Sequence, residues 1–129
     1  MIKSFVFCLL LGVSSDLTIQ NKEYWVKQLT NSSFQIRINA IQTLAQLKYT
    51  DTIAPLAERL KDEEPQVRYA AIRGLSGIPH RDSLAAIDQA LGQEQDSYLK
   101  SEMRRAKKSL EDLLKQEAHE GVKEKSPSQ

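Results

Sequence analysis

The stretch "EPQVRYAAIRGLSGIP", residues 64–79, repeats a pattern that the chain has already used once. The earlier copy is "SFQIRINAIQTLAQLKY", residues 33–49, in which Arg37 lies 31 positions before Arg68. Three leucines outside the quoted stretches keep the same spacing: Leu29, Leu60 and Leu91. A fixed period of this size predicts a stacked array of similar structural units.

The second unit shows what one unit contains. Its first apolar pattern has the three-and-four spacing of one helix face, at Ile53, Leu56, Ala57 and Leu60. A second pattern of the same kind follows the polar residues 61–64, at Val67, Ala71, Leu75 and Ile78. Pro65 suits a first helical turn, and Pro79 stops the second helix. Each unit is therefore predicted to be a helical hairpin.

The predicted fold is all-α: a short right-handed α-α superhelix of about three helical hairpins. Helices are expected at about 19–30, 34–48, 52–61, 65–77, 82–92 and 97–117. The repeat domain covers residues 16–117, with units at about 19–50, 51–81 and 82–117. Asp51 and Asp82 are placed to cap first helices. Residues 118–129 are polar and lack periodicity, which predicts a disordered tail.

The length and the net charge of the chain limit the functions that it can have. The 129 residues correspond to one domain, and 18 Lys and Arg against 17 Asp and Glu give a formal net charge of +1. This balance argues against a nucleic-acid binder and against an enzyme for acidic substrates. Any electrostatic function must therefore depend on a local patch.

The N-terminal residues differ from the rest. Lys3, the apolar run at residues 5–13 and the small residues that follow have the order of a secretory signal peptide, predicted at residues 1–15. The run is too short for a stable membrane span, which needs roughly 20 residues. Cleavage predicts an exported protein, periplasmic or extracellular, that lacks Cys8, the only cysteine. The alternative is a retained N-terminal helix packed on the first unit of a cytoplasmic protein.

The second unit resembles a known repeat. Asp62 precedes Arg68 with five residues between them, Val67 stands before the arginine, and Ala71 follows it. This pattern resembles the HEAT repeat, especially the short type found in phycobilisome lyases, over about residues 20–115. The resemblance implies a ladder of Asp–Arg pairs that links neighbouring loops along the stack.

The other two units depart from this pattern. Asn31 replaces the acid of the first unit. In the third, Gln93 and Leu99 stand where the Asp and Arg are expected, and Glu102 stands where Ala40 and Ala71 stand. The missing pair fits a terminal unit that has no further neighbour. Arg37 and Arg68 have two interpretations, as rungs of the ladder or as ligands for a phosphate or carboxylate.

The sequence offers no catalytic constellation. His80 and His119 are its only histidines, and no pair of histidines has metal-binding spacing. Phosphate-cradling glycine motifs and the G-x-S-x-G motif of hydrolases are also missing. We therefore predict a protein that is not an enzyme and that has no cofactor and no metal site.

The last helix carries one apolar stripe, at Leu99, Met103, Ala106, Leu110 and Leu113. The stripe is expected to close the end of the stack, and a second interpretation is pairing with another chain. A homodimer is therefore left open. Basic residues on the same helix are either a binding surface or ordinary solvated side chains.

The second helices of a stack lie side by side, so their non-core positions form a shared face. The partner-binding residues predicted on this face are Ile38, Gln42, Tyr69, Arg73, Lys100 and Arg104. The predicted function is a non-catalytic scaffold or adaptor that binds a protein or peptide. One alternative is an intracellular binder of nucleic acid or of a larger assembly. A weaker one is a lyase-like or chaperone-like accessory protein.

Overall fold

The structure is a computed structural model that describes the backbone of residues 14–124 and the side chains of residues 21–122. The helices are α2 (Ser14–Gln28), α3 (Phe34–Leu47), α4 (Ile53–Glu58), α5 (Pro65–Ser76), α6 (Arg81–Leu91) and α7 (Ser97–Glu124). Short 3-10 turns, Thr50–Thr52 and Arg59–Lys61, extend α4 at both ends. The described part contains no strand, and the predicted all-α fold is confirmed.

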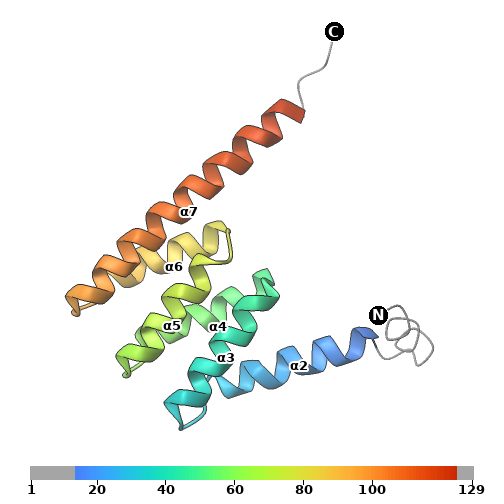
Figure 1. Cartoon of the computed structure of the whole chain (residues 1–129), viewed down its shortest axis with the longest axis vertical. Coiled ribbons are helices and arrows are strands. Elements are labelled where there is room, and N and C mark those ends of the chain that lie inside the picture. Colours follow the sequence, from blue (N-terminus) through green and yellow to red (C-terminus); the bar gives the residue numbers. More distant parts are fainter. Residues whose placement is uncertain (1–13, 125–129) are drawn as a thin grey trace, which may run out of the picture.

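The six helices form three consecutive hairpins, α2 with α3, α4 with α5 and α6 with α7 (Figure 1). The second helices α3, α5 and α7 lie side by side, and α5 packs against both of the others. The first helices α4 and α6 pack against each other in the second layer. This is the two-layer arrangement of a short α-α solenoid.

The core runs continuously through all three units. Leu56, Val67, Leu75 and Ile87 are fully or almost fully buried, as the apolar pattern of the sequence predicts. A close approach of α3 and α5 depends on Gly74, where an added Cβ would lie 3.2 Å from the Cβ of Ala45. Small residues at this crossing let two second helices pack closely.

The caps of the first helices differ from the prediction. Asp82 lies inside the first turn of α6, and its backbone N–H donates to Nδ1 of His80, the actual N-cap, at 3.1 Å. Asp51 lies in the 3-10 turn and pairs with Lys22 on α2 at 2.6 Å. The predicted aspartate caps are therefore wrong. Both aspartates follow the start of their helical turns, where a carboxylate is still favourable in the dipole field.

The third unit follows the second with a spacing of 32 in its second helix. The buried positions of α5 and α7 then correspond, because Val67 matches Leu99 and Ala71 matches Met103. The spacing in the first helices remains 31, so one extra residue lies in the loop between α6 and α7. The predicted alignment of Gln93 and Leu99 with the Asp and Arg of the ladder is therefore wrong by one residue.

The C-terminal boundary also needs correction. Helix α7 runs to Glu124, so residues 118–124 are helical and the disordered tail predicted from residue 118 does not begin there. This segment contains good helix formers and a single glycine, Gly121, which costs only about 1 kcal/mol and does not stop a helix that is already nucleated. Beyond Leu110 no described side chain of α7 is buried, and the helix projects past the array (Figure 1).

Residues 1–13 and 125–129 lie outside the described residues, so the signal peptide at residues 1–15 stays a prediction. Helix α2 begins at Ser14, inside that predicted segment. Among the described helices, none combines the length and the apolar character that a membrane span requires.

Candidate functional site

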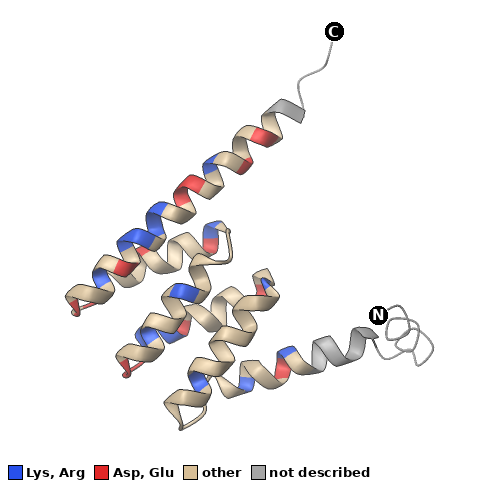
Figure 2. Ribbon diagram, in the orientation of Figure 1, with Lys and Arg blue, Asp and Glu red and all other residues tan. Residues whose placement is uncertain are grey.

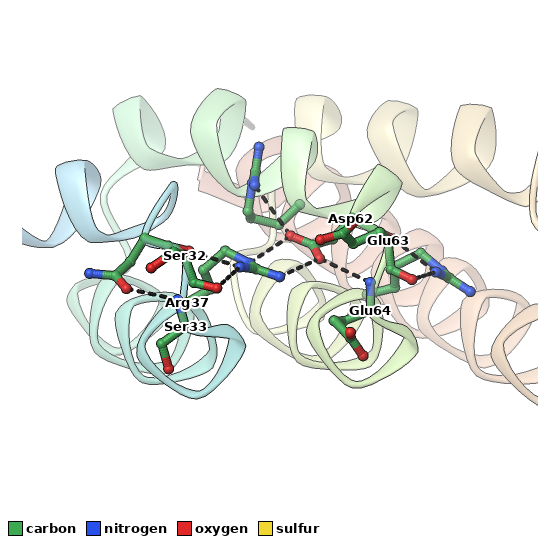
Figure 3. A network of polar contacts seen from close by, with 9 residues as sticks. Ser32, Ser33, Arg37, Asp62, Glu63 and Glu64 are labelled. Carbon is green, nitrogen blue, oxygen red and sulfur yellow. Dashed lines mark hydrogen bonds and ion pairs between the residues drawn. The ribbon is translucent and has the colours of Figure 1, made fainter.

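Ion pairs join the loops of the array, and Figure 3 shows the first of them, between Arg37 and Asp62. Arg37 donates from Nε and Nη2 to the two carboxylate oxygens of Asp62, both at 3.0 Å. Its Nη1 also donates to the backbone carbonyls of Asn31 at 2.7 Å and Ser32 at 3.2 Å. The side chains of Arg37 and Asp62 are 8% and 3% exposed. A planar guanidinium with both of its edges occupied is held rigidly between the first two loops.

A second rung joins the second and third loops. Arg68 donates to Glu94 from Nε at 2.9 Å and from Nη2 at 3.3 Å, and to the carbonyl of Asp62 at 2.8 Å. Burial raises the pKa of Glu94, but hydrogen bonds from the Asp96 N–H and from Arg68 outweigh that effect and leave the pKa lowered. The acid expected at Gln93 is therefore present one residue later, because of the extra loop residue.

The three loops share one turn. The side chains of Asn31, Asp62 and Glu94 each accept a hydrogen bond from the N–H two residues ahead, at 2.9, 3.0 and 3.0 Å. Asn31 has no arginine of a preceding unit to pair with in the described chain, so a neutral side chain suffices there. Both predicted arginines, Arg37 and Arg68, are thus engaged as rungs of the ladder.

A separate hollow of ≈ 790 Å³, called here the groove, opens along the second helices. Helix α3 contributes Ile38, Gln42, Ala45 and Gln46, and α5 contributes Pro65, Gln66, Tyr69, Ala70, Arg73 and Gly74. Asp96, Tyr98 and Leu99, at the start of α7, close one side. Glycine and alanine at the floor, where α3 and α5 approach closely, make the surface concave.

The groove combines aromatic, amide and cationic groups with one carboxylate, that of Asp96, which accepts the Leu99 N–H at 3.0 Å. The rings of Tyr69 and Tyr98 stack with their centroids 6.1 Å apart. Repulsion from Tyr69 is the largest cause that raises the pKa of Tyr98, so the Tyr98 phenol is a neutral hydrogen-bond donor at neutral pH. Arg73 is exposed and forms no ion pair with any described residue. A carboxylate of a ligand that binds in the groove would therefore form its ion pair with Arg73.

The structure brings together four of the six predicted partner-binding residues. Ile38, Gln42, Tyr69 and Arg73 all line the groove. Lys100 and Arg104 do not, because the extra loop residue turns α7 by one position relative to the expected alignment. The same shift explains why sequence reasoning missed Tyr98, which enters the groove. In the corrected register Tyr98 takes the position of Gln66, which also lines the groove but was not predicted to lie on the shared face.

The first half of α7 is basic and its second half is acidic (Figure 2). Residues 100–108 contain five Lys or Arg and one Glu, whereas residues 111–120 contain four Asp or Glu and one Lys. Some of these charges are paired within the chain, since Lys107 contacts Asp88 at 2.6 Å and Arg105 contacts Glu102 at 3.1 Å. This pairing reduces the basic charge available to a polyanion.

The described residues contain no group of three or more His, Cys, Asp or Glu side chains that could hold a metal ion. The polar groups of the groove suit recognition, because they are donors, amides and the single carboxylate of Asp96, without a paired base and nucleophile.

The fold and the ladder agree with the comparison with known families. Residues 23–108 match the family model for HEAT repeats, and the chain belongs to this family. The match does not distinguish the phycobilisome lyase type from other HEAT repeats. HEAT repeats generally mediate protein interactions and are generally non-catalytic. No curated protein matches the chain.

Proposed function

We propose that this protein is a non-catalytic scaffold that binds a segment of a partner protein in the groove. The observation that carries the proposal is the groove itself, where an aromatic pair and an exposed, unpaired arginine of the described chain surround a hollow of ≈ 790 Å³. Tyrosine and arginine are enriched at the energetic centres of protein interfaces.

The groove is built on rigid elements. Its floor consists of helices α3 and α5, which the rung between Arg37 and Asp62 holds in register at the loop end. A preformed surface loses little conformational entropy when a ligand docks, so shallow contacts can still give useful affinity. The ladder therefore supports binding without contacting the ligand.

The chemistry of the lining predicts the chemistry of the ligand. Ile38 and the tyrosine rings favour an apolar side chain, and Arg73 favours a carboxylate beside it. The amides of Gln42 and Gln46 are one helical turn apart and can pair with backbone groups. The expected ligand is a peptide segment with one or two large apolar residues flanked by Asp or Glu.

A displayed peptide library, panned on the full chain, tests the proposal. We expect enrichment of apolar residues next to Asp or Glu, and loss of the acidic preference in Arg73→Glu. Arg81→Glu is the matched control, because Arg81 is an exposed arginine of α6 outside the groove. Both variants should keep the wild-type helical signal and melting temperature.

Two results would overturn the proposal. One is a library that enriches no motif, and the other is a motif that Arg73→Glu and Arg81→Glu retain equally. Duplex DNA and RNA serve as competitors in the same assay. Salt-sensitive binding of these polyanions that does not depend on Arg73 would favour the nucleic-acid alternative.

A further inference from the structure

The groove carries opposite charges at its two ends. The second helices α3, α5 and α7 lie side by side and begin at the same end of the array, the end that the ion-pair ladder joins. Asp96 immediately precedes α7 and lines the groove at this loop end. In the corrected register Asp96 corresponds to Glu64, so Arg73 of α5 lies nine residues farther along. At 1.5 Å per residue the two charged positions are about 13 Å apart along the helix axes.

Both charges are free of ion pairs in the described part of the chain. Asp96 is exposed, and only one of its carboxylate oxygens is engaged there, by the Leu99 N–H at 3.0 Å. Lys100, one turn farther along α7, lies outside the groove and does not pair with Asp96. Arg73 is exposed and unpaired in the same way. The two ends of the groove can therefore each form an ion pair with a ligand.

An apolar site lies between the two charges. Tyr98 follows Asp96 by two residues, and Tyr69 precedes Arg73 by one helical turn. The two rings stack with their centroids 6.1 Å apart, and Ile38, which corresponds to Tyr69 in the first unit, lines the groove from α3. A ligand that lies along the groove therefore meets a carboxylate, then an aromatic and aliphatic surface, and then a guanidinium.

An extended peptide segment fits this spacing. Alternate side chains of an extended chain point to the same side, and residues i and i+4 lie about 13 Å apart at 3.3 Å per residue. A helical ligand would need nine residues to span the same distance, and its backbone groups would be paired internally. An extended ligand leaves its backbone N–H and C=O groups available to the amides of Gln42 and Gln46, which also line the groove. The side chains at i, i+2 and i+4 can then face the three parts of the groove together.

We infer that the groove selects an extended segment in which a basic residue and an acidic residue lie on opposite sides of one large apolar residue, each two positions away from it. The basic residue pairs with Asp96, the apolar residue contacts Tyr69 and Tyr98, and the acidic residue pairs with Arg73. This inference rests on the proposed function and deepens it, because it confines the acidic residue to one flank and makes Asp96 a determinant of specificity. A ligand placed the other way round would bring like charges together at both ends.

A library of end-blocked peptides with a fixed central leucine and randomised flanks, bound to the full chain, tests the inference. The wild type should enrich Lys or Arg two positions from the leucine on one side, together with Asp or Glu two positions away on the other. Asp96→Asn should lose the basic preference and keep the acidic one. Asparagine is as good a helix cap as aspartate, so this variant should keep the wild-type helical signal. In an enriched peptide, lysine replaced by glutamine should weaken binding to the wild type about fivefold and leave binding to Asp96→Asn unchanged.

Glu63→Gln is the matched control, because Glu63 is an exposed acid of the preceding loop that does not line the groove. This variant should keep the basic preference. A basic preference that Asp96→Asn retains, or that Glu63→Gln loses equally, overturns the inference, as does enrichment of acidic residues on both flanks. The proposed function survives each of these results if the acidic preference still depends on Arg73. A library that enriches no motif overturns both.

Discussion

Replacing Asp62 with asparagine should destabilise the protein by about 3 kcal/mol. The carboxylate is 3% exposed and accepts bonds from Arg37, Arg59 and the Glu64 N–H. Breaking a buried pair from one side costs about 3–5 kcal/mol, because the remaining charge stays desolvated. The lower end applies here, since Arg37 keeps its two carbonyl acceptors. Asparagine also preserves the turn, as Asn31 does in the first loop.

The second rung provides the comparison. Glu94→Gln should cost about 1.5 kcal/mol, the value of a hydrogen bond to a charged group, because the Arg68 side chain is 18% exposed and water can replace the lost partner. Against a total stability of about 5–15 kcal/mol, both effects are measurable by urea unfolding followed by helical circular dichroism. The slope of the free energy with urea should stay constant.

A double-mutant cycle isolates the ion pair. Arg37→Met alone leaves the Asp62 carboxylate buried without this partner. Arg37→Met combined with Asp62→Asn removes both charges of the pair. The double variant should therefore be about 2 kcal/mol more stable than the sum of the two single effects predicts. Additive effects, or a larger cost for Glu94→Gln than for Asp62→Asn, would refute the argument that buried charge pairing holds the loops together.

Three further outcomes are expected. The pKa of Glu94 is lowered in the folded state, so its contribution to stability is present above its unfolded pKa of about 4.3 and is lost as the pH falls through the folded value. The stabilities of Glu94→Gln and the wild type should therefore converge in unfolding experiments at acidic pH. Gly74→Ala should change stability by less than about 1 kcal/mol, because its helix propensity offsets a 3.2 Å contact, whereas Gly74→Leu should destabilise by about 2 kcal/mol or more in urea unfolding. Arg104→Ile combined with Lys107→Leu should produce concentration-dependent association in size-exclusion chromatography, since it creates an apolar face on the last unit.

The period of the sequence was sufficient to predict the fold. Spacing of three and four within each unit determines which face is buried, and the structure buries Val67, Ala71 and Leu75 as expected. The end of α7 was not predictable in the same way. A polar segment without an apolar stripe is predicted to lack packing contacts, but its composition does not tell whether it is a solvent-exposed helix or a coil. A solvated helix can continue wherever no residue stops it.

The candidate site was predictable only where the register was regular. Ile38, Gln42, Tyr69 and Arg73 belong to the first two units, which are related by 31 residues, and all four line the groove. Tyr98 was missed because the 31-residue register aligns it with the buried Val67, and because its true counterpart, Gln66, was not predicted on the face either. Registers in repeat arrays are best assigned from buried positions separately for each helix.

The corrected register also determines how the two ends of the array differ. The positions of Ile41 and Ile72, which are buried, are taken in the third unit by the exposed Arg104, so the last unit presents charge where the earlier units present apolar surface to a neighbour. At the other end Ile36 is 37% exposed, although its counterpart Val67 is fully buried. Another hairpin could therefore stack on the first unit but not on the third without desolvating charge.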